Sequence, residues 1–327
     1  MKNNNKAGGQ LFYLLALLLA SVIWGSAFVG QSIGAGYVGA LTFLTARSWI
    51  AFFFLIPVIA VIDIAKEGKV KKGFGITGFS GRQVLTGGLV CGLWLFFASY
   101  SQQVGIAYTT TAKSGFITAL YVVIVPFFAL FMGQKVEKKM WVCVITAVIG
   151  MYLLCMKGSF TLALGDALIL LCAFLFAGQI MAINTYAPKV DGVRLCWLEF
   201  LTVAVLSTIF MFIFEKPVWA DIMAAMPSML YVGIMSSGVA YTLQIIGQAG
   251  LSPTVASLAM CMESVFSAIF GWLILHQSLT PRELAGCCLM FAAIAGSQLG
   301  PVTSDTKADD NAEEMVKMVP QKLQGEQ

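Results

Sequence analysis

The chain has 327 residues and a mass of 35.2 kDa, and 59% of its residues are hydrophobic whereas only 11% are charged. Soluble globular proteins carry about 25% charged residues, so this composition excludes a water-soluble fold and indicates a membrane protein. The single histidine, His276, excludes zinc sites built on two histidines. The eight cysteines lie in apolar stretches, where free cysteine behaves as a small hydrophobic residue. We therefore expect no disulfide framework, no metal site and no cofactor.

Ten apolar stretches are long enough to cross a membrane, because a helix needs about 20 residues to span the hydrocarbon core. In chain order they are 11–30, 39–62, 84–104, 110–132, 140–157, 163–186, 194–214, 227–248, 254–275 and 283–300. Turn residues separate them, and Ser252 with Pro253 marks the start of the ninth. The breaks at 105–110 and 247–253 are the weakest, so nine or eleven spans are alternatives. The first stretch exceeds the apolar core of a signal peptide, which favours a retained helix.

The distribution of lysine and arginine supports ten spans. With the N terminus inside the cell, fifteen of these residues fall on the cytoplasmic side and four on the outer side, with Arg47 set apart inside the membrane. The four outer residues are Lys113, Lys157, Lys216 and Arg282. Such an excess of positive charge marks the cytoplasmic loops of membrane proteins. Both termini are therefore expected in the cytoplasm, and the polar residues 301–327 are expected to form a disordered cytoplasmic tail.

Short matches indicate an internal repeat. The tripeptide at 103–105 (QVG) matches that at 248–250 (QAG), and 133–136 (GQKV) matches 276–279 (HQSL). These shifts divide the chain into 1–157 and 158–300, with five helices in each half. Because an odd number of helices places the second copy upside down, the expected fold is an all-α membrane protein of two inverted five-helix repeats. Inverted repeats build many secondary transporters, with the substrate site near the midplane.

Several motifs add a family resemblance over residues 11–300. They are Trp24-Gly25-Ser26 with Phe28, Arg47 ten residues before Pro57, the segment 111–118 (TAKSGFIT) with Tyr121 and Pro126, and Glu263-Ser264-Val265-Phe266. In these positions the chain resembles the EamA-like transporters of the drug/metabolite transporter superfamily. It departs from the usual family pattern at Ser264, at His276-Gln277 and at Gln134.

The resemblance implies ten helices in two inverted repeats, alternating access, and movement of small organic metabolites across the membrane. It does not imply a particular substrate, because the family is broad. Small multidrug exporters related to this fold use a carboxylate in the first helix for proton exchange, but residues 11–30 contain none. Any proton coupling must therefore be carried elsewhere.

Three charged residues stand out away from the ends of the predicted spans, where a charge costs at least ~2.5–3.5 kcal/mol. Glu263 lies about nine residues into its helix, or roughly 14 Å deep, and is our proton-coupling candidate, although a purely structural carboxyl is the alternative. Arg47 and Glu199 lie in the second helix of each half. Inversion separates them by roughly 10 Å in depth, so we expect no salt bridge. We expect Arg47 to bond carbonyl groups or reach outward, and Glu199 to lie in a wet location near the interface.

Polar residues spaced along helix faces predict a shared binding cavity. They are Lys113, Thr118 and Tyr121 in the fourth helix, Tyr241, Gln244 and Gln248 in the eighth, their counterparts Ser99 and Gln103 in the third, and the weaker candidates Gln179 and Trp24. Residues three, four or seven apart lie on one face of a helix. Interhelical hydrogen bonding by glutamine is the alternative interpretation, and Lys113 is equally consistent with an interfacial anchor.

The leading hypothesis is a secondary transporter for small organic metabolites in the plasma membrane, amino acids or similar compounds including drugs, with efflux as the expected direction. The expected partners are a small-molecule substrate and membrane lipids, with no nucleic acid, and the chain is expected to act as a monomer or homodimer. The sequence has no phosphate-binding loop for ATP. It also shows no repeated channel filter and no paired catalytic groups, so we expect neither a channel nor an enzyme. The main alternative is a translocase of a lipid or lipid-linked precursor.

Overall fold

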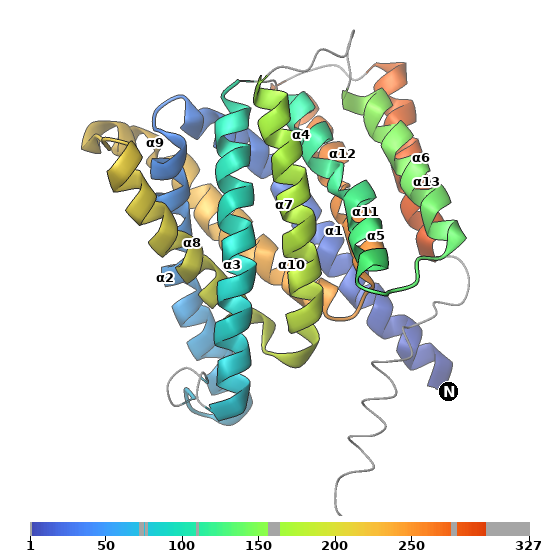
Figure 1. Cartoon of the computed structure of the whole chain (residues 1–327), viewed down its shortest axis with the longest axis horizontal. Helices are drawn as coiled ribbons and strands as arrows, with labels where there is room; N and C mark the ends of the chain where they lie inside the picture. Colours follow the sequence, from blue (N-terminus) through green and yellow to red (C-terminus); the bar gives the residue numbers. More distant parts are fainter. Residues whose placement is uncertain are drawn as a thin grey trace, which may run out of the picture.

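The computed structural model describes residues 2–71, 75, 78–108, 111–155, 164–275 and 280–298, and Figure 1 shows them as a bundle of helices. Within these residues every regular element is helical. The first half forms α1 (Lys2–Ala35), α2 (Ala40–Glu67), α3 (Gly78–Ile106), α4 (Thr111–Ala119), α5 (Tyr121–Phe131) and α6 (Lys138–Cys155). The second half forms α7 (Leu164–Tyr186), η2 (Ala187–Lys189), α8 (Gly192–Phe214), α9 (Trp219–Tyr231), η3 (Val232–Ala240), α10 (Tyr241–Gln248), α11 (Pro253–Met260), α12 (Glu263–Leu275) and α13 (Pro281–Gln298). The predicted tail from residue 301 and the segment 276–279, one of the two copies in the repeat match, lie outside the described residues.

Eight segments of the described chain are long and apolar enough to cross a membrane. They are Gln10–Ala35, Ala40–Glu67, Gly81–Ile106, Ser114–Phe131, Leu164–Lys189, Gly192–Phe214, Trp219–Gln248 and Pro253–Phe270. Each of them coincides with one of the ten predicted stretches. The remaining two stretches are occupied by α6 and α13, which have 18 residues each. The prediction of an all-helical membrane protein is confirmed, and the count of ten spans stays a prediction.

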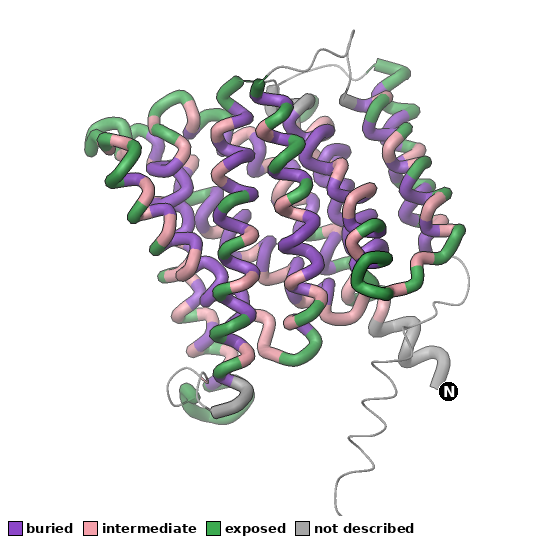
Figure 2. Tube along the Cα trace, in the orientation of Figure 1, coloured by how far each residue is buried: buried purple, intermediate pink, exposed green. Residues whose placement is uncertain are grey.

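The outer faces of the bundle are apolar. Figure 2 shows buried residues mainly along the inward sides of the helices and exposed residues along the outward sides. Phe131, Phe212 and Trp219 expose 88%, 70% and 72% of their surface. Soluble proteins rarely expose contiguous apolar patches of more than a few hundred Å², whereas the hydrocarbon core of a bilayer requires an apolar surface. This exterior is suited to lipid.

Three of the predicted continuous spans are irregular near their middle. The chain turns between α4 and α5, where the N–H of Leu120 donates to the carbonyl of Ile117 at 3.2 Å, and between α11 and α12, where the N–H of Met262 donates to Ala259 at 3.3 Å. These tightened bonds between residues three apart replace the normal helical ladder. The segment η3 is a wider π-helix between α9 and α10. Non-helical backbone inside a membrane is tolerated where it is buried in protein or lines a cavity.

Helices of the first half pack mainly against helices of the second. Contacts join α3 to α7, α1 to η3 and α10, α2 to α8, and α6 to α13. Figure 1 shows α6 and α13 side by side at one edge of the bundle. Glycine permits their close approach, because a Cβ atom on Gly150 would lie only 2.8 Å from the carbonyl oxygen of Gly286. The two halves are therefore interlocked rather than separate domains in space.

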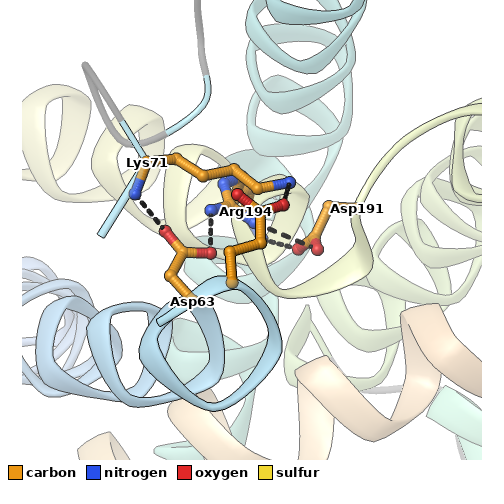
Figure 3. A network of polar contacts seen from close by, with 5 residues as sticks. Asp63, Lys71, Asp191 and Arg194 are labelled. Atoms are coloured by element: carbon orange, nitrogen blue, oxygen red, sulfur yellow. Dashed lines mark hydrogen bonds and ion pairs between the residues drawn. The ribbon is translucent and has the colours of Figure 1, made fainter. Parts of the chain in front are cut away.

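The pair α2–α8 is joined at one end by the polar cluster drawn in Figure 3. The guanidinium of Arg194 lies 2.5 Å from the carboxylate of Asp63 and 3.1 Å from that of Asp191. Asp63 also accepts a hydrogen bond at 3.0 Å from the backbone N–H of Lys71. Because only 5% of the Arg194 side chain and 2% of the Asp63 side chain are exposed, the ion pair is shielded from solvent.

The opposite end of the same pair is joined by Glu215, the residue that ends α8. Its carboxylate accepts hydrogen bonds from the backbone N–H groups of Leu41 and Thr42 at 2.9 and 2.8 Å, and from the Thr42 hydroxyl at 2.6 Å. The first N–H groups of a helix have no partner within the helix, so Glu215 satisfies two of those of α2. Contacts at both ends hold α2 and α8 in one register.

Candidate functional site

A cavity lies inside the bundle, and the empty space between its walls, including the part open to solvent, is about 490 Å³. It lies between two apolar clusters, one formed mainly by α1, α4 to α7 and α11 to α13, and the other by α2, α3, α8 and α10. Trp24 and Phe176 pack against both clusters. The walls are formed by Trp24, Phe28, Gln31, Arg47, Gln102, Thr118, Tyr121, Phe176, Gln179, Ile180, Ser236, Tyr241, Gln244, Met260 and Glu263. Both halves of the chain thus contribute.

The irregular segments of the fold meet at this cavity. Thr118 and Tyr121 flank the break between α4 and α5, and Met260 and Glu263 flank the break between α11 and α12. Ser236 belongs to the π-helix η3. Discontinuous helices at the contact between repeats are the usual way in which transporters build a site near the membrane midplane. The breaks are therefore explained by the cavity that they line.

Hydrogen bonds link the polar wall residues in pairs. The phenol of Tyr121 donates to Glu263 Oε1 at 3.3 Å, and Arg47 Nη1 donates to Gln31 Oε1 at 3.1 Å. Arg47 and Glu263 expose only 4% and 5% of their surface. The indole of Trp24 meets the ring of Tyr241 edge to face, with 5.1 Å between centroids. The cavity wall therefore combines a cation, a carboxyl group and aromatic surface.

Eight of the residues predicted from the sequence line this cavity. They are Trp24, Arg47, Thr118, Tyr121, Gln179, Tyr241, Gln244 and Glu263. They come from seven separate helices, so the fold brings together positions up to 239 residues apart in the chain. The polar faces read from the spacing thus converge on one space, and their role in binding a substrate stays a prediction.

Three other predicted residues do not line it. Gln103 Nε2 donates to the carbonyl of Gln31 at 3.5 Å, and Gln248 Nε2 donates to that of Ile180 at 3.1 Å. These two repeat-matched glutamines therefore hold one helix to another, which was the alternative interpretation. Ser99 is buried outside the cavity wall. The predicted site residue Lys113 has its side chain outside the described part of the chain, so its role stays a prediction.

The expectation for Glu199 is wrong, and one of the two for Arg47 is met. Arg47 is buried and bonds to the amide carbonyl oxygen of Gln31; it does not reach outward. Glu199 has no exposed surface and accepts from Gln179 Nε2 at 2.9 Å, so it does not lie in a wet interface. The depth argument placed Glu199 by helix position alone and ignored the surrounding helices, which cover it. Each of the two charges has a glutamine partner of its own, and neither is paired with the other.

Comparison with known proteins identifies the family. The sequence pattern of the EamA-like transporter family matches residues 11–156 and again residues 163–298. The chain belongs to the EamA-like transporter family. An uncharacterized transporter of Archaeoglobus fulgidus is 28% identical over 87% of this chain and 85% of its own length. The uncharacterized transporter YoaV of Bacillus subtilis is 23% identical over 86% of this chain and 94% of its own length.

A solved crystal structure shares the fold of this EamA-like protein. It superposes with a TM-score of 0.69 at 18% sequence identity, over 88% of this chain and 96% of its own. The family and the apolar helices together show a multi-pass integral membrane protein that acts as a transporter. The resemblance to the drug/metabolite transporter superfamily inferred from the motifs is confirmed.

Sequence reasoning missed several wall residues of this EamA-like transporter. Gln31 was missed because the first span was ended at Gly30, whereas α1 continues to Ala35. Gln102 was passed over because its neighbour Gln103 carries the repeat match; Gln102 Nε2 in fact donates to Thr118 Oγ1 at 3.3 Å inside the cavity. The other missed residues are Phe28, Phe176, Ile180, Ser236 and Met260. Most of them are apolar, and no sequence signal separates an apolar cavity wall from an apolar core.

Proposed function

We propose that this transporter carries small organic metabolites, amino acids or similar compounds including drugs, across the plasma membrane by alternating access, with efflux as its direction. The observation that carries the proposal is the cavity between the two apolar clusters, with Arg47 and Glu263 in its wall. Ligand sites are mostly apolar cavities with a few convergent polar groups.

The charges favour a substrate that has an acidic and a basic group. The guanidinium of Arg47 suits a carboxylate, because its planar fork of donors matches two acceptor oxygens. The carboxyl group of Glu263 suits an amine and is also our candidate for proton coupling. The aromatic residues Trp24, Phe28 and Tyr241 would pack against an apolar side chain. An amino acid with an aromatic side chain satisfies all three parts of the wall.

Two inverted five-helix repeats, 1–157 and 158–300, are part of the proposal. The packing supports them, because α3 contacts α7 as η3 and α10 contact α1, and α7 contacts α4 and α5 as α1 contacts α11 and α12. Exchanging the halves thus leaves the pattern of neighbours unchanged. The fourth span of each half is also interrupted. We propose ten spans on this basis, with α6 and α13 as the fifth of each half, both termini in the cytoplasm, and a monomer or homodimer in lipid.

The contacts of α2 and α8 constrain how access alternates. One of these helices belongs to each half, and Asp63 with Arg194 joins them at one end while Glu215 joins them at the other. The two repeats cannot rock apart as rigid bodies unless one of these connections breaks. A movement that breaks one connection and opens the cavity at that end, while the connection at the opposite end holds, is compatible with these contacts.

The test uses purified protein in liposomes with a pH dye inside and labelled L-phenylalanine, other amino acids and cationic drugs outside. We expect counterflow of an amino acid accompanied by proton flux, and we expect Glu263→Gln to remove the proton flux while the protein still folds. Glu67→Gln is the matched control, because Glu67 lies on the exposed end of α2 and pairs with Lys71 at 2.9 Å. Its proton flux should equal that of the wild type.

The possible outcomes distinguish a proton-coupled carrier, an uncoupled carrier and a lipid translocase. Counterflow without proton flux in the wild type would retain the carrier and reject coupling through Glu263. Normal proton flux in Glu263→Gln would reject this residue as the coupling site. No movement of any compound on the panel would reject the proposed substrates and would bring forward the alternative, a lipid or lipid-linked precursor.

A further inference from the structure

Glu199 lies directly behind the cavity wall without lining it. The residue has no exposed surface; its Oε1 accepts from Gln179 Nε2 at 2.9 Å, and its Oε2 has no hydrogen-bond partner among the described residues. Its backbone is held against α3, because a Cβ atom on Gly92 would lie 2.8 Å from the Glu199 carbonyl oxygen. The carboxyl group thus contacts the wall through one glutamine and has little room to move.

A second glutamine extends this contact along the wall. Gln244 Nε2 donates to Gln179 Oε1 at 3.1 Å, and both side chains line the cavity. In its ionised form Glu199 can only accept hydrogen bonds; the NH₂ group of Gln179 is turned toward it and the oxygen of Gln179 toward Gln244. Gln244 must then turn its own NH₂ group toward Gln179. Glu199 therefore sets the direction of both amides.

The last oxygen of this series has no partner. Gln244 is 2% exposed, and its Oε1 is buried without any hydrogen-bond donor in the described residues. Leaving a buried acceptor unsatisfied is unfavourable, and such groups in a native structure call for a physical reason. A donor supplied by a bound ligand is a sufficient reason, because Gln244 is part of the cavity wall.

We infer that Glu199 is a positioning residue that fixes Gln244 as a hydrogen-bond acceptor, so that the cavity selects ligands with an N–H donor at this point. The inference rests on the proposed function and deepens it. A second pair in the wall consists of Arg47 and Gln31. Arg47 can only donate hydrogen bonds, and it donates to Gln31 Oε1 at 3.1 Å. The NH₂ group of Gln31 is therefore turned away from Arg47. The positive charge of Arg47 therefore fixes the amide of Gln31 in one direction, and the negative charge of Glu199 fixes the amide of Gln244 in the opposite direction.

The closing experiment compares two probes of equal charge. L-phenylalanine has N–H donors, whereas its N,N,N-trimethyl betaine has the same positive charge and none. Binding of each to purified protein in lipid nanodiscs is measured by calorimetry. The wild type should prefer phenylalanine by roughly tenfold, because the betaine leaves the Gln244 oxygen unsatisfied. Glu199→Gln should lose this preference, since an amide can present either a donor or an acceptor to Gln179.

Gln244→Leu removes the acceptor itself and should lose the preference in the same way, which keeps the test decisive if Glu199→Gln does not fold. The matched control is Glu215→Gln, the same chemical change at the end of α8, where the preference should stay at the wild-type value. Equal binding of both probes by the wild type would overturn the inference and leave the proposed function standing. A preference that survives in Glu199→Gln would overturn the role of Glu199. Binding of neither probe would overturn the inference together with the amino-acid substrate.

Discussion

The polar cluster that joins α2 to α8 and the polar wall of the cavity are both buried, but they differ in how completely their groups are partnered. In the cluster, Arg194 contacts two carboxylates, and Asp63 also accepts from the backbone of Lys71. In and behind the cavity wall, Arg47 Nε, Gln244 Oε1 and Glu199 Oε2 have no partner among the described residues.

This difference separates structure from function. A buried polar group without a partner costs about 1–3 kcal/mol, and in the cavity wall a bound substrate can supply the missing partner. The ion pair between α2 and α8 is closed and can serve stability or gating alone. The cavity wall is open to a ligand, and a substrate would complete its hydrogen bonds. Breaking each region should therefore have a different consequence.

The largest effect on stability is expected from Arg194→Met. This change leaves two buried or half-buried carboxylates without their common partner, and breaking a buried pair from one side is strongly destabilising. We expect the melting temperature in detergent to fall on the order of 10 °C. Arg282→Met is the control, because Arg282 lies over the ring of Tyr152 between α13 and α6, with its guanidinium carbon 5.4 Å from the centroid.

Exchange of the two charges sharpens this prediction. The double variant Asp63→Arg with Arg194→Asp restores an ion pair between α2 and α8. Its melting temperature should therefore be higher than that of either single variant. A melting temperature equal to that of Arg194→Met would show that the pair has no such role, and that Arg194 acts through other contacts.

A smaller effect, on affinity rather than on folding, is expected from Gln31→Leu. The amide of Gln31 is the hydrogen-bond partner that holds Arg47 in the cavity wall. Hydrogen bonds to charged groups contribute about 1.5–3 kcal/mol, so the affinity for L-phenylalanine should fall by at least about tenfold. Binding of 2-phenylethylamine, which has no carboxylate for Arg47, should change much less. An equal loss for both probes would mean that Gln31 shapes the cavity and does not position Arg47.

The sequence predicted the fold more fully than the site because the two depend on different information. Apolar length is a local property, and it located the helical stretches, including the start of α11 at Pro253, although α9 begins at Trp219, ahead of the predicted start at 227. Charged residues such as Arg47 and Glu263 stand out in an apolar span, so they were found. The breaks beside Leu120 and Cys261 were not predicted, because no residue pattern there differs from a continuous helix.

The direction in which a glutamine points could not be predicted at all. Gln102 and Gln103 are neighbours, yet Gln102 lines the cavity whereas Gln103 donates a hydrogen bond to the backbone of α1. A rotation of about 100° per residue separates them on the helix, and only the packing of α3 against α1, α4 and α7 decides which residue faces the cavity. The repeat match pointed to Gln103, which has a counterpart in the second half, and Gln103 is the glutamine that holds two helices together.

The smallest effect is therefore expected at these matched glutamines. Gln103→Leu and Gln248→Leu each remove one hydrogen bond to a backbone carbonyl of the first helix of a half, at Gln31 and at Ile180. Interhelical hydrogen bonds of this kind contribute about 0.6 kcal/mol on average, so each variant should lower the free energy of unfolding by about that amount. Denaturant unfolding measures it, with transport of L-phenylalanine followed in parallel. A loss of affinity as large as that of Gln31→Leu would mean that these amides also contact the substrate. The distinction between residues that hold helices together and residues that bind the substrate would then be wrong.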